Sequence, residues 1–244
     1  MKRVLLGPNA VFEAIRSPQA PSIAAVFIDT ERHDARVKEL VAVARSRKIP
    51  VDERLGKELD LLAKGERHQG VVAIAGEYSY RTLEDLLDPG TAPPFLVALD
   101  QITDPQNFGA IVRSAVAFGA RGIITLRDRA APVTAAVVRA SAGATEQARI
   151  ARVTNLAETI RHLREQGLQT VGLDADGDVP ISELPRAPGG RLVVIGAEGA
   201  GLRRLVRERC EVLAHIPMAG SFNSLNASVA AAIALYEGSR SGAH

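Results

Sequence analysis

The sequence of 244 residues contains one cysteine, Cys210. A single cysteine excludes an internal disulfide and cannot build a thiolate metal site. The first ten residues, MKRVLLGPNA, also lack the apolar run of a secretory signal peptide. These absences predict a protein of the reducing cytoplasm.

Long apolar runs and a large net charge are also missing. No stretch reaches the roughly 18 uncharged apolar residues that span a bilayer, because Asn226 and Ser228 interrupt the Ala-rich C-terminal segment. We therefore expect no membrane role. The 30 basic and 28 acidic side chains leave a net charge of +2, so any attraction for nucleic acid must come from local patches. The five histidines are scattered without ligand spacing, and we expect no metal.

The sequence does hold enough apolar residues for a core, 46% of the chain, which suits one large domain or two modest ones. The run DPGTAPP at 88–94 combines turn formers without a periodic apolar pattern, which is typical of a linker. We expect a small domain at 1–76, a linker at 77–94 and a larger domain at 95–244. The slight basic excess lies in 1–76, with 13 Lys or Arg against 10 Asp or Glu.

Both domains show the pattern of an α/β fold. In the first, short apolar runs at 23–28 and 71–75 alternate with helical patterns at 9–16 and 36–47. In the second, helical patterns separate apolar runs at 95–99, 122–126, 168–173 and 191–196, which is typical of a parallel sheet covered on both faces. Ligands of such sheets bind beyond the carboxyl ends of the strands. The loops after Leu99, Ile195 and Ile216 are therefore the candidate site.

The first of these loops, at 99–120, leads from a strand into a helix. Asn107 stands where we expect the N-cap, and Gly119 should close the helix. Arg113 points roughly opposite the apolar stripe of this helix and has small residues one turn away on either side, which leaves its guanidinium approachable. A solvated arginine on an outer face is the plainer interpretation of this residue alone.

The second loop, GAEGAGL at 196–202, follows a strand and opens a helix, and its glycines allow backbone to approach a ligand. A dinucleotide site is the obvious alternative. The glycines run G-x-x-G-x-G rather than G-x-G-x-x-G, and no acid stands about twenty residues further on, which argues against a dehydrogenase. Glu198 between the glycines could simply stabilise the N-terminus of the next helix.

The third stretch, at 215–238, combines a short strand, a Gly/Ser turn and a helix with little polar surface. Ser224, Asn226 and Ser228 cluster where the helix starts, and on the plainest interpretation Ser224 caps it while the other two satisfy nearby backbone groups. One such loop is routine. Three strand-to-helix loops that all carry polar groups among small residues favour a binding site.

These three stretches resemble the three signature motifs of the SpoU/TrmH (SPOUT) group of RNA 2′-O-ribose methyltransferases. The motifs are NFGAIVRS at 107–114, IGAEGAGL at 195–202 and IPMAGSFNSLNASVA at 216–230, in the order and spacing of that group. The N-terminal GPNAVFEAI and RHQGVVA are more loosely similar to the substrate-binding domain of the member that methylates a guanosine in the peptidyl-transferase loop of 23S rRNA.

The resemblance implies a C-terminal α/β methyltransferase domain tied into a deep trefoil knot, a homodimer, and S-adenosylmethionine as the cofactor. It implies cofactor binding around Gly196, Glu198, Gly199, Ile216, Met218 and Leu225. It also places five residues on the polar active-site positions of the group, which are Asn107, Arg113, Glu198, Ser224 and Asn226. An RNA substrate, with ribosomal RNA favoured, follows from the same resemblance.

The roles of these residues can be argued from their chemistry. A guanidinium stays protonated at ordinary pH, so Arg113 suits the stabilisation of negative charge on the ribose oxygen, or a grip on a phosphate, better than the role of a base. Asn107 and Ser224 would orient Arg113 or the ribose, and Glu198 with Asn226 would hold the loops around the cofactor. The turn Arg67, His68 and Gln69 is the candidate RNA contact of the first domain, although such a turn can also be merely solvated.

Three alternatives stay open at the level of the sequence. The chain could methylate transfer RNA, or another ribosomal site, including one that confers antibiotic resistance. It could also be an RNA-binding or ribosome-assembly protein that has lost catalysis, although the intact polar positions argue against this.

Overall fold

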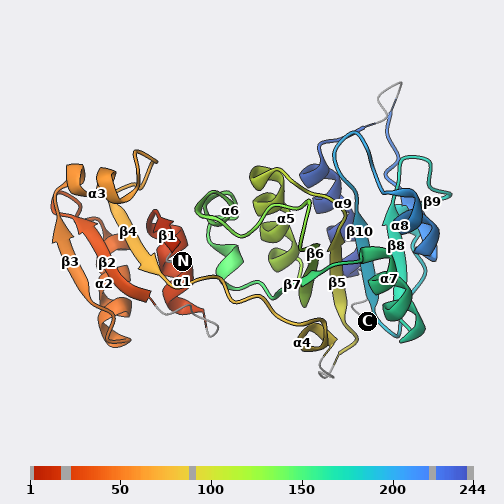
Figure 1. Cartoon of the computed structure of the whole chain (residues 1–244), viewed down its shortest axis with the longest axis horizontal. Helices are drawn as coiled ribbons and strands as arrows, with labels where there is room; N and C mark the ends of the chain where they lie inside the picture. Colours follow the sequence, from red (N-terminus) through yellow and green to blue (C-terminus); the bar gives the residue numbers. More distant parts are fainter. Residues whose placement is uncertain (1–2, 18–22, 88–91, 220–223, 241–244) are drawn as a thin grey trace. The chain divides into compact units, whose positions relative to one another are not determined.

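The computed structural model describes residues 3–17, 23–87, 92–219 and 224–240 and divides into two compact units (Figure 1). The first unit comprises Met1–Ser79 and Pro132–Gln147, and the second comprises Tyr80–Ala131 and Ala148–His244. The sequence had placed 132–147 with the C-terminal domain, but in the structure this segment packs with the first unit. The linker bounds at 77–94 stay a prediction.

The first unit is a small α/β structure, as expected. Its sheet has the order β1-β4-β2-β3, in which β4 pairs antiparallel with β1 and β2 while β2 and β3 run parallel. The strands are β1 (Arg3–Leu6), β2 (Ile23–Asp29), β3 (Val51–Arg54) and β4 (Val71–Ala75). The helices are α1 (Pro8–Arg16), α2 (Ala35–Ser46), α3 (Gly56–Leu62), α6 (Ala135–Ala140) and the short η1 (Ala144–Glu146).

A buried ion pair explains why 132–147 belongs to the first unit. The Glu146 carboxylate, 1% exposed, accepts two hydrogen bonds from the guanidinium of Arg3 at 2.8 and 3.1 Å. The Ser17 hydroxyl donates to the Glu146 carbonyl at 2.6 Å. At Gly143 a Cβ would lie 2.9 Å from the Ala10 Cα, so only glycine permits this approach to α1.

The second unit is built on a seven-stranded sheet in the order β7-β6-β5-β10-β8-β11-β9, and every pairing in it is parallel. Its strands are β5 (Phe95–Leu99), β6 (Gly122–Leu126), β7 (Ile150–Val153), β8 (Gln169–Leu173), β9 (Val179–Pro180), β10 (Arg191–Ile195) and β11 (Val212–His215). Its helices are α4 (Leu83–Leu87), α5 (Pro105–Ala117), α7 (Leu156–Glu165), α8 (Arg204–Arg209) and α9 (Ala227–Arg240), with a short η2 (Ile181–Glu183).

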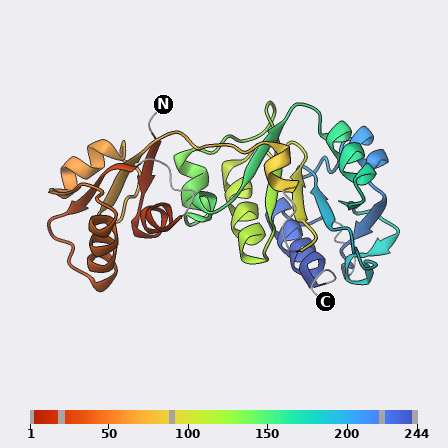
Figure 2. The same cartoon turned by 90° about the horizontal axis from the view of Figure 1, so that it is seen from below.

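Helices cover both faces of this sheet, which confirms the predicted class (Figures 1 and 2). On one face α4, α7 and α8 bury Leu86, Ile160 and Val206 against alternate residues of β5, β6 and β10. On the other, α5 and α9 pack on each other, and Gly238 of α9 touches β5 and β10. The strands are nearly continuous apolar runs because both of their faces are buried.

The crossover connections diverge between two neighbouring strands. β5 leads into α5 on one face of the sheet, whereas its neighbour β10 leads into α8 on the opposite face. Such a point opens a crevice beyond the carboxyl ends of the two strands. The candidate loops after Leu99 and Ile195 border this crevice. The trefoil knot implied by the resemblance stays a prediction.

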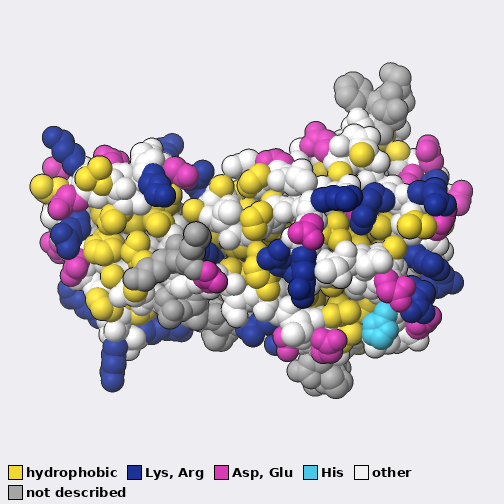
Figure 3. All heavy atoms as spheres, in the orientation of Figure 1, with side chains coloured by type: hydrophobic (Ala, Val, Ile, Leu, Met, Phe, Trp, Pro, Cys, Tyr) yellow, Lys and Arg dark blue, Asp and Glu magenta, His cyan; other side chains and the backbone are white. Residues whose placement is uncertain are grey.

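The surface is mixed in charge. Figure 3 shows Lys and Arg side chains interspersed with Asp and Glu over the visible face. Across the described residues, no helix combines the length and apolar character needed to cross a bilayer. Among the same residues, no cluster of three or more His, Cys, Asp or Glu side chains could hold a metal ion.

Candidate active site

The first candidate loop enters α5 through an aspartate cap. The Asp104 carboxylate accepts hydrogen bonds from the backbone N–H groups of Gln106 and Asn107 at 3.1 and 3.2 Å, and Pro105 occupies the first helical turn. The expectation that Asn107 is the N-cap is therefore wrong. Because Asp104 takes that role, the Asn107 side chain is left to point out of the first turn. Gly119, with φ of 76°, follows the end of the helix as predicted.

The second loop is a tight turn rather than an open one. Ala197 and Gly201 exchange two backbone hydrogen bonds, at 3.1 and 2.9 Å, across Glu198, Gly199 and Ala200. Gly199 and Gly201 have φ of 75° and 65°, which favours glycine. The turn therefore holds Glu198 at its tip.

Residues from all three loops meet in one hydrogen-bonded cluster. The Asn107 amide and the Asn226 amide each donate to Glu198 Oε2 at 3.1 Å, and the Asn226 amide also donates to Asn107 Oδ1 at 3.0 Å. Asn226 Oδ1 in turn accepts from the backbone N–H and the hydroxyl of Ser228 at 2.9 and 2.6 Å. Asn226 thus caps α9, and the interpretation of Ser224 as the cap is wrong. We call Asn107, Glu198 and Asn226 the amide–carboxylate cluster.

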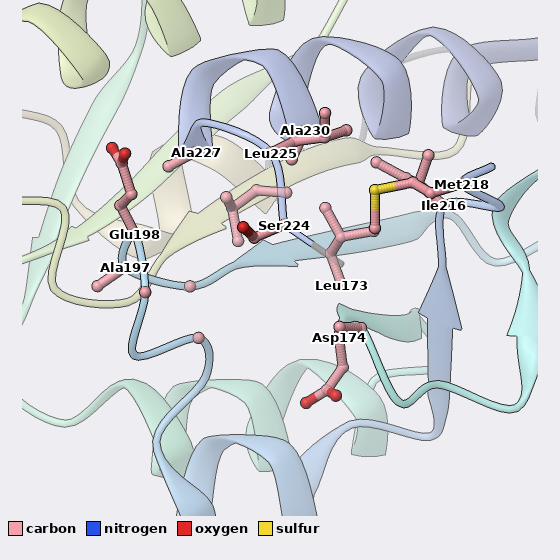
Figure 4. Close-up of a pocket in the computed structure, with 15 residues that line it drawn as sticks. Leu173, Asp174, Ala197, Glu198, Ile216, Met218, Ser224, Leu225, Ala227 and Ala230 are labelled. Carbon is pink, nitrogen blue, oxygen red and sulfur yellow. The ribbon is translucent and has the colours of Figure 1, made fainter. Parts of the chain in front are cut away.

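Beside this cluster lies a pocket of about 430 Å³ at the carboxyl ends of β8, β10 and β11. Figure 4 shows Glu198 and Asp174 on opposite sides of it, with Ser224 between them and Met218 beside Ile216, on the side away from Glu198. All six residues expected to hold the cofactor line this pocket, namely Gly196, Glu198, Gly199, Ile216, Met218 and Leu225. Their role in binding it stays a prediction, as does that of Ser224, which lines the same pocket.

The pocket has the size and lining of a small-molecule site. Leu173, Ile195 and Ile216 provide apolar walls for a flat aromatic ring, and the carboxylates of Asp174 and Glu198 suit a ligand that carries positive charge. Gly196 packs so tightly against the Gly201 backbone that a Cβ would lie 2.3 Å from its carbonyl carbon. Backbone rather than side chain therefore forms this wall. These features fit S-adenosylmethionine, a cationic molecule with an adenine ring.

The structure does not bring Arg113 into the amide–carboxylate cluster. Arg113 is exposed on α5, and it makes no hydrogen bond or ion pair with any residue that the structure describes. It lies six residues after Asn107, which corresponds to about 9 Å along the helix axis and about 120° around it. Asn107 therefore faces the cluster while Arg113 faces away from it.

The candidate RNA contacts of the first unit lie in a turn before β4. Arg67 and Gln69 are exposed. The His68 ring is held on both sides, by Asp60 at 3.0 Å and by the backbone N–H of Gly70 at 3.1 Å. His68 thus stabilises the turn, and its contact with RNA, like that of its neighbours, stays a prediction.

Two acidic residues were missed by sequence reasoning. Asp174 follows β8 and lines the pocket, and its carboxylate lies 3.0 Å from the guanidinium of Arg207. The strand-end rule that selected the loop after Leu99 would have found it after Leu173 as well. Asp100, which follows β5, is fully buried and accepts from the backbone N–H and the side-chain Nε of Arg203 at 2.9 and 2.7 Å. Arg203 is the N-cap residue of α8, so Asp100 fixes the far end of the Glu198 turn.

We expect Asp100→Asn to weaken cofactor binding through this turn. The amide would point a donor at the N–H groups of Arg203, and the free energy of unfolding should fall by about 1–3 kcal/mol. The dissociation constant of S-adenosylmethionine, measured by calorimetry, should rise about tenfold, which is about 1.4 kcal/mol. The matched control is Glu146→Gln, which breaks the buried pair with Arg3 in the first unit. Equal loss of cofactor affinity in both variants would contradict a specific role for Asp100.

Cys210 lies near Asp100 and Asp174, and we expect its thiol to be unreactive. Burial, together with the charges of Asp100 and Asp174, raises the pKa of the thiol to about 12. A free thiol ionises near pH 8.5, and the thiolate is the form that reacts. Alkylation by iodoacetamide at about pH 9 should therefore be slow in the native protein and fast in guanidinium. Because the folded pKa lies above the unfolded one, this group lowers stability as the pH rises above about 9.

The fold and the site define an α/β enzyme that binds a small, positively charged organic molecule at the carboxyl edge of a parallel sheet. Comparison with known proteins identifies the family. Residues 94–236 match the model of the SpoU rRNA methylase family, and residues 4–81 match the model described as RNA 2′-O ribose methyltransferase substrate binding. The chain therefore belongs to the SpoU family of RNA methyltransferases.

Similar proteins support this assignment. A protein of Mycobacterium sp. (strain KMS), named as an uncharacterized tRNA/rRNA methyltransferase, is 45% identical over 96% of this chain and 75% of its own length. Two solved structures are each 29% identical and cover 98% of this chain. They are an AdoMet-bound rRNA methyltransferase from Sinorhizobium meliloti, with a TM-score of 0.79 and 87% of its chain covered, and the SpoU methyltransferase AviRb from Streptomyces viridochromogenes with AdoMet, with a TM-score of 0.78 and 89% covered.

Proposed function

We propose that this protein transfers a methyl group from S-adenosylmethionine to a ribose 2′-hydroxyl in ribosomal RNA, at a guanosine in the peptidyl-transferase loop of 23S rRNA. The observation that carries the proposal is the amide–carboxylate cluster, which joins all three motifs beside a pocket that fits the cofactor. The AdoMet bound in both solved relatives supports the choice of cofactor. The N-terminal match to a substrate-binding model supports a large structured RNA.

When bound, S-adenosylmethionine supplies a methyl group that is already activated by the positive charge on sulfur. The residues of this chain then have two tasks, to align the ribose with that methyl group and to stabilise charge on its oxygen. Hydrogen bonds among Glu198, Asn107 and Asn226 hold the three loops in one arrangement. This arrangement fixes the position of the ribose relative to the cofactor pocket. Arg113 stabilises the developing negative charge on the 2′-oxygen while the hydroxyl proton passes to water.

We further propose that the active enzyme is a homodimer in which Arg113 of one protomer serves the site of its partner. Within one chain Arg113 faces away from the amide–carboxylate cluster. The helix that packs beside α5 exposes an apolar stripe, since Val229 and Tyr236 lie two turns apart on α9 and are 48% and 47% exposed. A second copy covering this stripe would lie next to Arg113.

The function is tested with ribosomal RNA from cells that lack the protein. After incubation with labelled S-adenosylmethionine, primer extension and mass spectrometry locate positions that resist alkali. A new 2′-O-methyl group on a guanosine of the peptidyl-transferase loop is the expected result. A mark on transfer RNA alone would overturn the ribosomal assignment, and no mark on either RNA would overturn catalysis. A cytoplasmic location stays a prediction.

A further inference from the structure

The first unit contains a groove of about 340 Å³ between α2 and the strands β2 and β3. Its walls are aliphatic, from Val37, Val41 and Val51, and the carboxylates of Asp29 and Glu53 lie on its sheet side. The groove belongs entirely to residues 28–53. It is separate from the amide–carboxylate cluster and its pocket, which lie in the second unit.

Two cationic side chains, Lys38 and Arg45, and the imidazole of His33 line this groove. Lys38, Arg45 and His33 are exposed, and none of them makes an ion pair or a side-chain hydrogen bond with any residue in the described part of the chain. Other cations nearby are engaged, since Arg36 stacks over Phe12 and pairs with Glu39 at 3.7 Å. The groove therefore combines unpaired positive charge with an apolar wall.

The spacing of the cations suits a linear polyanion. Lys38 and Arg45 are seven residues apart on α2, which places them on one face and about 10 Å apart along the axis. The third cation, Arg32, pairs with Asp34 at 2.7 Å and packs against Gly70, where a Cβ would lie 2.7 Å from the Arg32 Cδ. Arg32 therefore lies next to the turn that carries Arg67, His68 and Gln69.

We propose that this groove binds a single-stranded segment of the RNA substrate, with phosphates on Lys38 and Arg45 and an unstacked base between the aliphatic walls. The inference rests on the proposed function and adds the place where the first unit contacts RNA. Proteins read single-stranded RNA by splaying out bases, which stack on planar side chains such as His or Arg and hydrogen-bond along their edges. The ring of His33, which lines the groove together with the aliphatic walls, offers such a plane, and Asp29 and Glu53 offer acceptors for amino or 2′-hydroxyl groups.

The salt dependence of binding tests this proposal. For single strands, each cation that contacts a phosphate contributes about 0.7 to the slope of log K against log salt concentration. In the variant Lys38→Gln/Arg45→Gln the slope should therefore be less steep by about 1.4, measured by fluorescence anisotropy with a fragment of the substrate RNA. Its KM for RNA should rise about tenfold, with kcat and the affinity for S-adenosylmethionine within about twofold of wild type.

The control removes two charges from the same unit outside the groove. In Arg16→Gln/Arg36→Gln the lost cations are exposed residues that stack on Phe12, and the slope should stay at the wild-type value. Equal slopes in the two double variants would overturn the groove as an RNA site. That result is distinct from failure of the proposed function, because the wild-type protein would still methylate RNA. Thermal unfolding of both variants checks that each is folded.

Discussion

Arg113→Ala is expected to lower the rate of methyl transfer by about 10²- to 10³-fold, the usual cost of removing one group that stabilises developing charge. The dissociation constant of S-adenosylmethionine should stay within about twofold, because Arg113 does not line the pocket. Single-turnover assays and calorimetry measure the two quantities separately.

The control for this variant is Arg164→Ala, which removes an exposed arginine from α7 in the same unit. Its turnover should match that of the wild type. Near-normal turnover in Arg113→Ala would remove Arg113 from the mechanism. A parallel loss of cofactor affinity would show instead that the substitution disturbs the pocket.

Mixing Arg113→Ala with Glu198→Gln tests whether Arg113 acts across the dimer. Glu198→Gln replaces the carboxylate that accepts from Asn107 and Asn226, and we expect this variant to be inactive as well. In a mixed dimer of Arg113→Ala and Glu198→Gln, one site keeps its own Glu198 and receives Arg113 from the partner. Random association should therefore restore about a quarter of the wild-type sites. If Arg113 served its own chain, both sites of the mixed dimer would be defective and the mixture would stay inactive. Unfolding and refolding the two chains together produces the mixed dimers.

Asn226→Asp is expected to have the second largest effect, a loss of about 10²-fold in kcat/KM. The wild-type amide donates both to Glu198 and to Asn107, at 3.1 and 3.0 Å. An aspartate of the same shape would place a second carboxylate against Glu198 and remove the donor to Asn107 Oδ1, while Glu198 would keep only the hydrogen bond from the Asn107 amide. The three loops would then be pushed apart at the point where they meet.

The pH dependence of Asn226→Asp shows whether its loss of activity comes from the added negative charge or from a changed shape of the side chain. Two adjacent carboxylates raise the pKa of one member of the pair, so a proton returns as the pH falls. The activity of Asn226→Asp relative to wild type should therefore rise between about pH 8 and pH 6. Ser228→Ala, which removes only the hydroxyl that donates to Asn226, should keep most of its activity. A pH-independent defect in Asn226→Asp would contradict the proposed repulsion.

Many of the regular elements of the fold could be predicted from the sequence because they depend on local patterns, but the short strands β1, β3 and β7 were not predicted. The apolar runs at 95–99 and 122–126 coincide with β5 and β6 residue for residue. The first residues of the helices were harder to predict. Asp104 and Asn107 are both good N-caps, and only the proline at 105, which favours the first helical position, could have decided between them. A similar ambiguity between Ser224 and Asn226 led to the wrong cap for α9.

The sequence alone determined the α/β class, part of the strands and helices, and three motifs whose residues pointed to one kind of chemistry. The tertiary structure alone decided what those residues touch. Asn107, Glu198 and Asn226 are far apart in the chain and meet only because parallel strands bring their carboxyl ends to one edge. The hydrogen-bond partners of Glu146 and Asp100 could not be predicted from the sequence for the same reason. A pattern shows that a group will be buried, but the packing of distant segments selects its partner.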